Sequence, residues 1–188
     1  MNKELIEIVD TVNSIRDSAS PPLGDGGLDW KSLPIEYFLF EEDFVEQNMR
    51  CIPMIVRFKM DNAGIKLKLA EWSKFNTWEK KELAIRPIDI SNELNDYRDF
   101  LSSLIVEYTN NTPTLLEEDQ NPEWANQITV PKILIEKSRE FNWIITTEQW
   151  KALTTLQRFA LLKLCRQGHE NRNFPKAMRE FGIVNGEK

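Results

Sequence analysis

The chain has 188 residues, of which 41% are hydrophobic and 29% charged, and its net charge is −6. This length suffices for one sizeable core, and the acidity argues against binding of nucleic acid, which normally needs a basic face. The two cysteines are far apart and make no disulfide framework, and no apolar run resembles a signal peptide or a membrane span, so we expect a cytoplasmic protein that is not attached to a membrane.

The first 33 residues are predicted to stand apart from the main domain. Residues 4–18 carry Leu5, Ile8 and Val12 at helical spacing, which indicates an amphipathic helix. Residues 18–27 contain a proline pair and several glycines, a composition typical of a linker. We therefore expect a helix and linker over residues 1–33, one helical domain over 34–183 and a short tail over 184–188. The apolar run 37–40 is compatible with either a short buried strand or the start of a helix.

The central feature of the sequence is a match between residues 52–83 and residues 130–161. The two stretches align without a gap at an offset of 78 positions (131 − 53 = 78). Self-similarity at a fixed period indicates a repeated supersecondary unit, although two helical segments with ordinary capping residues can also match by chance. Six pairs are identical: Pro53 and Pro131, Ile55 and Ile133, Lys59 and Lys137, Trp72 and Trp150, Thr77 and Thr155, and Leu83 and Leu161.

Each copy predicts a helix, a tight turn, a short segment with a tryptophan, and a second, capped helix. Pro53 and Pro131 suit the first turn of a helix, where a missing N–H costs nothing. Gly64 suits the left-handed residue after the helix, and Asn142, at the matching position, is the next-best residue for that conformation. Ile65, Leu67 and Leu69 alternate with lysines, so a short extended piece is also compatible with the first copy.

The second helix of each copy has a capping-box spacing. Asn76 with Glu79 and Thr154 with Gln157 each pair an N-cap side chain with a residue three positions later. We expect Trp72 and Trp150, just before these helices, to fill the interior of their copies.

Further helices are predicted after each copy. Asp89 or Ser91 is expected to cap a long helix whose apolar stripe includes Tyr97, Leu101 and Leu104. Residues 109–123 are predicted to be a polar loop that joins the copies. The helix that begins at Thr154 is expected to run to residue 167 and to stop at Gly168, and a short final helix begins with Pro175 and ends at Gly182. The overall prediction is a mainly α-helical single domain with an internal duplication, in which Pro53, Gly64, Trp72, Pro131, Trp150 and Gly168 are structural.

The sequence offers little for catalysis. His169 is the one histidine in the chain, so any Ser–His or Cys–His system has to use it. Cys165 lies on the apolar face of a predicted helix, and we expect a buried thiol there. Cys51 is next to Arg50, which can lower a thiol pKa, but a packing role is favoured. We find no glycine-rich phosphate motif and no metal-ligand spacing, and we expect neither a cofactor nor a metal.

Two sets of polar residues are candidates for binding a partner. The first, which we name the basic group, stands out in an acidic chain and suits an acidic partner or an anionic cofactor. Alternatively, it is a scattering of lysine and arginine side chains around a core helix. The second is the polar loop after Gly168, which suits recognition or, alternatively, local capping of a helix end. The basic group is Arg50, Arg57, Lys59, Lys66 and Lys68, and the loop begins with His169, Glu170 and Asn171.

Two stretches carry a resemblance to a known family. The first comprises Arg50-Cys51-Ile52-Pro53-Met54, Val56-Arg57-Phe58-Lys59 and Gly64-Ile65-Lys66-Leu67, and the second comprises Leu153-Thr154, residues 156–161, His169-Glu170-Asn171 and Asn173-Phe174. In this order they resemble the two signatures of the nitrate-reductase-associated proteins, best known in cyanobacteria. The similarity covers roughly residues 38–181, and Met60 replaces a more usual leucine, a conservative change in a core.

The resemblance implies a cytoplasmic accessory protein that is needed to obtain active assimilatory nitrate reductase and is not itself the catalyst. The reductase carries a molybdenum cofactor and an iron–sulfur cluster, so the implied partner is the immature enzyme or its cofactor-delivery machinery. Three alternatives remain: a small enzyme that acts on a cofactor precursor through His169 or Cys51, a protein-interaction domain of another pathway, and a nucleic-acid-binding regulator, which the net acidity disfavours.

Overall fold

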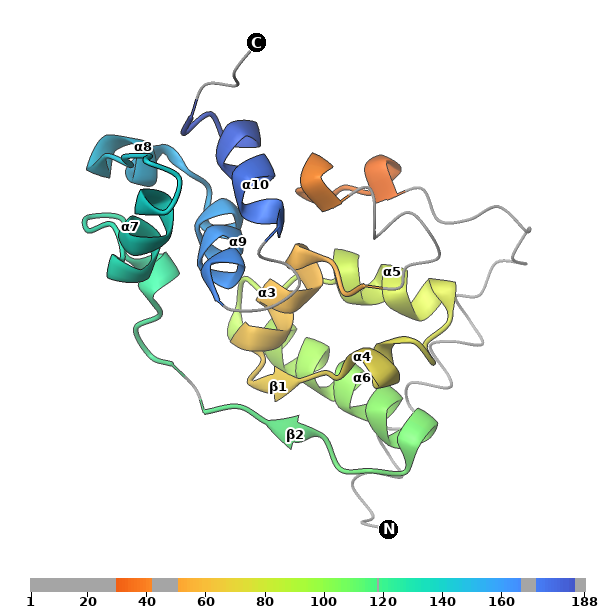
Figure 1. Cartoon of the computed structure of the whole chain (residues 1–188). Coiled ribbons are helices and arrows are strands. Elements are labelled where there is room, and N and C mark those ends of the chain that lie inside the picture. Colours follow the sequence, from red (N-terminus) through yellow and green to blue (C-terminus); the bar gives the residue numbers. More distant parts are fainter. Residues whose placement is uncertain (1–29, 42–50, 118, 167–171, 185–188) are drawn as a thin grey trace. The chain divides into compact units, whose positions relative to one another are not determined.

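The computed structural model describes residues 30–41, 51–117, 119–166 and 172–184 (Figure 1). The predicted helix over residues 4–18 and the predicted linker over 18–27 lie outside the described residues. The described part of the chain is mainly helical, with one small sheet of two strands, so the predicted fold class is confirmed. No helix in these ranges combines the length and the apolar character that crossing a membrane requires.

The described residues form two compact units. Unit 1 contains residues 30–37 and 51–117, and unit 2 contains residues 38–41, 119–166 and 172–184. The sequence predicted one domain over residues 34–183, whereas the structure divides this stretch so that residues 52–83 lie in unit 1 and residues 130–161 lie in unit 2.

Unit 1 is a helical unit closed by a two-stranded ribbon. Its core gathers the apolar faces of its helices around Trp72, Leu83 and Leu101, all of which are fully buried. The predicted stripe of the long helix is confirmed, and Phe100 also belongs to it. The elements are η1 (Trp30–Ser32), α3 (Met54–Asn62), β1 (Ile65–Lys66), α4 (Leu69–Trp72), α5 (Thr77–Ile85), α6 (Ser91–Thr109) and β2 (Thr114–Leu115).

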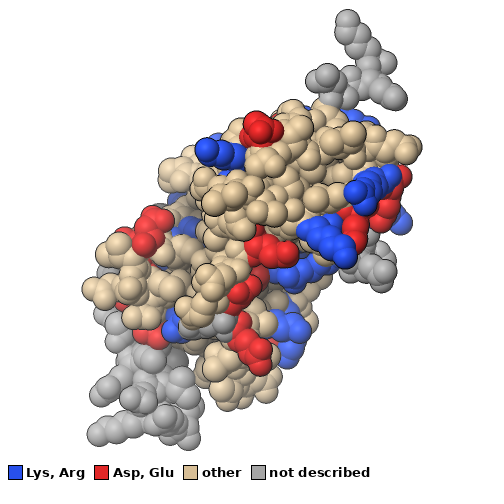
Figure 2. All heavy atoms as spheres, turned by 90° about the vertical axis from the view of Figure 1, so that its left-hand side faces the viewer, with Lys and Arg blue, Asp and Glu red and all other residues tan. Residues whose placement is uncertain are grey.

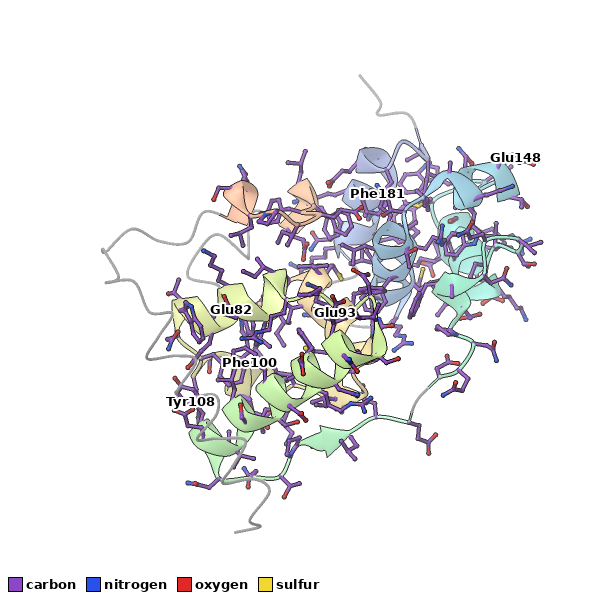
Figure 3. All side chains as sticks on the ribbon, turned by 180° about the vertical axis from the view of Figure 1, so that it is seen from behind. Glu82, Glu93, Phe100, Tyr108, Glu148 and Phe181 are labelled. Atoms are coloured by element: carbon purple, nitrogen blue, oxygen red, sulfur yellow. The ribbon has the colours of Figure 1, made fainter. Side chains whose placement is uncertain are left out.

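The start of α5 carries the predicted capping box. The Asn76 side chain accepts from the Glu79 amide at 2.9 Å, and the Glu79 carboxylate accepts from the Asn76 amide at 2.8 Å. The second Glu79 oxygen accepts from the hydroxyl of Tyr108 at 3.0 Å. Tyr108 is near the end of α6, and Glu93 marks the start of the same helix (Figure 3). Because Glu79 is fully buried, these three hydrogen bonds offset the loss of its hydration.

The start of α6 differs from the prediction. Its N-cap residue is Ile90, which has no capping side chain, and neither Asp89 nor Ser91 occupies that position. Instead, the Glu93 carboxylate accepts from the amides of Asp89 and Ile90 at 2.9 and 3.3 Å. A carboxylate in the first turn also favours the positive end of the helix dipole, so Glu93 replaces the expected cap.

The predicted polar loop after α6 contains a strand that the sequence did not reveal. Residues Thr114–Leu115 form β2 and pair antiparallel with β1, so that Ile65 lies opposite Leu115 and Lys66 lies opposite Thr114. The extended piece in the first copy is therefore present, and its partner comes from the connection between the two copies.

Unit 2 has the same order of helices around its own core. Trp150, Leu161 and Phe174 are fully buried. Its elements are η2 (Leu39–Glu41), η3 (Glu123–Ala125), α7 (Lys132–Arg139), α8 (Thr147–Ala152), α9 (Thr155–Cys165) and α10 (Phe174–Glu180).

An early segment of the chain completes unit 2. The apolar run that suggested a strand or a helix is a 3-10 turn, η2, next to α10. The ring of Phe38 lies 4.9 Å from that of Phe181. Phe181, labelled in Figure 3, follows α10 directly, and the preceding Glu180 carboxylate accepts from the amides of Leu39 and Phe40 at 2.7 and 2.9 Å. We name the residues 38–41 the inserted segment, because unit 1 residues flank it in the sequence.

The helix α9 ends earlier than predicted. It stops at Cys165, and Arg166 is already extended, with φ −71° and ψ 149°. The prediction that the helix runs to residue 167 and stops at Gly168 is therefore wrong, and Gly168 itself lies outside the described residues. The end of α10 does follow the prediction, because Gly182 is left-handed, with φ 68°.

The helices of the two copies begin at equivalent positions. The starts of α3 and α7 are 78 residues apart (132 − 54 = 78), and the same offset relates α4 to α8 and α5 to α9. The prolines at these starts, Pro53 and Pro131, are N-cap residues with nearly equal backbone angles, one residue before the position predicted. These equivalences are what an internal duplication requires, while the superposition of the copies about a two-fold axis stays a prediction.

The turns after the first helices also match. Gly64 has φ 66° and Asn142 has φ 57°, so both left-handed predictions are confirmed. A left-handed residue reverses the chain after the helix, and glycine and asparagine tolerate it best.

Candidate functional site

The basic group is only partly a surface feature. Arg50 lies outside the described residues. Arg57 is half-buried on α3, and its Nε donates to the carbonyl of Ile52 at 2.8 Å, which fixes the guanidinium beside the start of the helix.

Lys59 is not on the surface, and its assignment to a binding surface is wrong. Its side chain is buried, and Nζ donates to the carbonyls of Ala84 and Arg86 at 2.6 and 2.5 Å. These carbonyls lie at the end of α5, where helix carbonyls lack intrahelical partners, so the ammonium caps that helix. Burial lowers the pKa of Lys59 to about 8, and the nearby Asp89 carboxylate opposes this shift.

The exposed members of the basic group lie along β1 and just after it. Lys66 is exposed on the strand, and Lys68 is exposed with its ammonium 3.7 Å from Glu71. Figure 2 shows a face on which lysine and arginine side chains are interspersed with aspartate and glutamate side chains rather than gathered in one area. The basic group is thus reduced to Lys66, Lys68 and the half-buried Arg57.

The second predicted binding set consists of His169, Glu170 and Asn171. These residues lie outside the described part of the chain.

Each unit contains a buried tryptophan with a cation over its ring, at equivalent positions. In unit 1, Lys80 Nζ lies 5.3 Å from the ring centroid of Trp72, and in unit 2 the guanidinium of Arg158 lies 5.9 Å from that of Trp150. Both tryptophans have no exposed surface, which confirms that they fill the interiors of their units. Burial lowers the pKa of Lys80, and the neighbouring Glu79 opposes that shift.

Arg158 holds several parts of unit 2 together. Its guanidinium donates to the carbonyls of Trp124 and Leu153 at 2.8 and 2.6 Å, and to the hydroxyl of Thr155 at 3.2 Å. The residue is 2% exposed, and burial lowers its pKa. Because these hydrogen bonds go to other groups of unit 2, we assign Arg158 a structural role. The sequence did not indicate this role, because a single arginine in a helix usually faces solvent.

The two cysteines lie in different environments. Cys165 is buried, as predicted, and burial raises the pKa of its thiol to about 12, so the thiol is protonated at neutral pH and is a poor nucleophile. Cys51 is half-buried in unit 1, shortly before α3. Within the described ranges, no group of three or more histidine, cysteine, aspartate and glutamate side chains is placed to hold a metal ion.

One exposed feature of unit 2 was missed by the sequence analysis. After the left-handed Asn142, residues 143–146 belong to neither a helix nor a strand; Ile144 is 83% exposed, whereas the next residue, Ile145, is buried. The rings of Phe141 and Trp143 stack at 4.9 Å, and the guanidinium of Arg179 lies 5.8 Å from the Trp143 ring. The offset of 78 could have revealed this stretch, because it aligns with β1.

The architecture therefore defines a small, mainly α-helical protein made of two similarly ordered helical units, each of which is centred on a buried tryptophan with a cation over it. A family comparison identifies it further. The model of the conserved nitrate reductase-associated proteins matches residues 37–181, and the chain belongs to this family. Comparisons with curated proteins and with solved structures gave no match.

Proposed function

We propose that the protein is a non-catalytic, cytoplasmic accessory factor that is required for active assimilatory nitrate reductase. It acts by binding the immature reductase or the partner that delivers its molybdenum cofactor. The observation that carries this proposal is the family match, which extends over both units rather than over one of them. Neither nucleic acid nor a membrane is part of the proposed role.

The side-chain chemistry favours binding over catalysis. The buried cations Lys59, Lys80 and Arg158 are held by carbonyl oxygens or aromatic rings, and the thiol of Cys165 is protonated at neutral pH. We assign the exposed Lys66, the half-buried Arg57 and the loop over residues 169–171 to the contact with the partner.

The proposal is tested by deleting the gene in its own host. The deletion strain should fail to grow on nitrate but grow on ammonium and on nitrite, because only the reduction of nitrate is affected. An immunoblot should still detect the reductase polypeptide, while extracts lack nitrate reductase activity and molybdenum is missing from the immunoprecipitated enzyme. Normal specific activity in the deletion strain would overturn the proposal.

Variants then separate a binding protein from an enzyme. Replacing both Cys51 and His169 by alanine removes the two candidate reactive groups, and we expect this variant to restore at least part of the reductase activity. Complete loss of activity with normal folding would favour an enzyme that acts on a cofactor precursor.

A charge reversal tests the exposed basic residues. Lys66→Glu should lower the recovery of reductase activity, and Lys132→Glu is its matched control, because the side chain of Lys132 is 87% exposed outside the basic group. Equal effects of the two reversals would remove Lys66 from the contact.

A further inference from the structure

The strand β1 shows how an extended segment is covered in unit 1. It pairs with β2, and the amide of Leu116 donates to the carbonyl of Gly64 at 2.8 Å. In antiparallel pairs, hydrogen-bonded positions alternate along the strand. Because Gly64 is such a position, the next residue whose N–H and C=O face β2 is Lys66, which lies opposite Thr114. The edge of β1 that carries these N–H and C=O groups is therefore covered by β2.

The equivalent stretch in unit 2 has no paired strand among the described residues. Asn142, Trp143 and Ile144 correspond to Gly64, Ile65 and Lys66, and the two turns share the left-handed conformation. Among the described residues the one sheet is formed by β1 and β2, so none of them pairs with residues 143–144. Exposure follows a similar order in both stretches, with Lys66 and Ile144 exposed and Leu67 and Ile145 buried. If residues 143–145 follow the course of β1, the backbone N–H and C=O of Ile144 point toward solvent, and an unpaired edge with an exposed apolar side chain is a template for pairing.

The surroundings of this edge select the chemistry of a partner. Cations lie over both rings beside it, with Lys137 Nζ 5.7 Å from the Phe141 ring and the Arg179 guanidinium 5.8 Å from the Trp143 ring. Lys137 also contacts the Glu140 carboxylate, whereas the side chain of Arg179 is exposed. An extended segment here meets an apolar and aromatic surface flanked by positive charge.

The segment that covers β1 has the complementary composition. Two leucines, Leu115 and Leu116, are followed by the acidic stretch 117–119. If the register of unit 1 is transferred to unit 2, the leucines fall opposite Trp143 and Asn142. The first acidic residue then falls opposite Phe141, the residue whose ring has Lys137 Nζ over it.

We propose that residues 142–145 are a docking edge at which a partner protein adds an extended, antiparallel strand composed of a leucine pair followed by acidic residues. Main-chain hydrogen bonds to Ile144 supply the pairing, and the aromatic rings and cations select the sequence. The β2 strand of a second copy is already engaged with its own β1, so the occupant is a different protein. This inference deepens the proposed function and rests on it for the expectation of a protein partner.

A labelled peptide with the sequence of residues 112–119 is the probe. Fluorescence anisotropy with the full chain should show saturable binding that weakens with salt, and hydrogen exchange should show protection of the Ile144 amide. Ile144→Glu places a negative charge opposite the acidic peptide, and we expect its Kd to rise about tenfold. Ile128→Glu is the matched control, because Ile128 is 81% exposed in the same unit, and its Kd should stay within about twofold of the wild-type value.

Several results would overturn the proposal. One is absence of saturable binding to the wild-type chain, and another is equal weakening by the two glutamate variants. A third is a change in protection of the Lys66 amide, which faces β2 and would show that the peptide replaces β2 in unit 1. Self-association of the chain that Ile144→Glu abolishes would identify a second copy as the occupant. Because the peptide assay needs no reductase, its failure leaves the deletion phenotype as a separate test of the proposed function.

Discussion

Replacing Trp150 by alanine should be among the most damaging single changes in unit 2. The ring is completely buried, and a large-to-small change at such a site costs about 3–5 kcal/mol. The indole Nε1 also donates to the carbonyl of Asn126 at 2.8 Å, a bond that contributes about 1 kcal/mol. The guanidinium of Arg158 loses the ring beside it, so we expect a total loss of about 4–6 kcal/mol.

The assay has to report on unit 2 rather than on the whole chain. A chain with two units need not unfold in one step, so we would follow unit 2 amides by native-state hydrogen exchange beside thermal melting. At about 2–4 °C per kcal/mol, the melting temperature should fall by roughly 8–24 °C. Trp150→Phe keeps most of the ring and removes the hydrogen bond, and it should cost about 1–2 kcal/mol. A Trp150→Ala variant that melts within about 2 °C of wild type would refute the reasoning.

Three further predictions concern single side chains. Gly64→Ala forces a Cβ into a backbone with φ 66° and should cost about 1–2 kcal/mol in chemical denaturation, whereas Asn142→Gly should cost nothing. Burial lowers the pKa of Lys59 to about 8 in the folded state, so above pH 8 the unfolded chain binds more protons than the folded chain. The free energy of unfolding of wild type relative to Lys59→Met should therefore rise by about 1–3 kcal/mol between pH 8 and 10.5. A difference that does not change with pH would contradict the buried position of this amine. Glu180→Gln puts an NH₂ against one of two backbone donors, so exchange at the Leu39 and Phe40 amides should accelerate about fivefold or more, with no change expected at Ile65.

The sequence predicted local features well where one residue type decides the backbone. The left-handed Gly64 and Asn142 and the capping boxes at Asn76 and Thr154 follow from short-range chemistry, and each is present. The buried positions of the two tryptophans follow from the repeat and from the size of the indole.

Features that depend on distant partners were not predictable in the same way. Lys59 looked like a surface cation, because its burial depends on carbonyls at the end of another helix. The pairing of β2 with β1 joins residues about 50 positions apart in sequence, and two-residue strands leave no alternation to detect. The cap of α6 was misassigned because the helix begins after Ile90, and the side-chain hydrogen bonds at its start come from Glu93, which accepts from the amides of Asp89 and Ile90.

Because of the inserted segment, unit 2 includes residues that precede most of unit 1 in the sequence. A cut near residue 119 would separate two pieces, and the later piece would lack the rings of Phe38 and Phe40 that lie beside Phe181. The earlier piece would carry those rings together with all of unit 1. The two pieces should therefore rejoin when mixed, as complementary halves of a split protein, and shortening the earlier piece to begin after residue 41 should abolish that recovery.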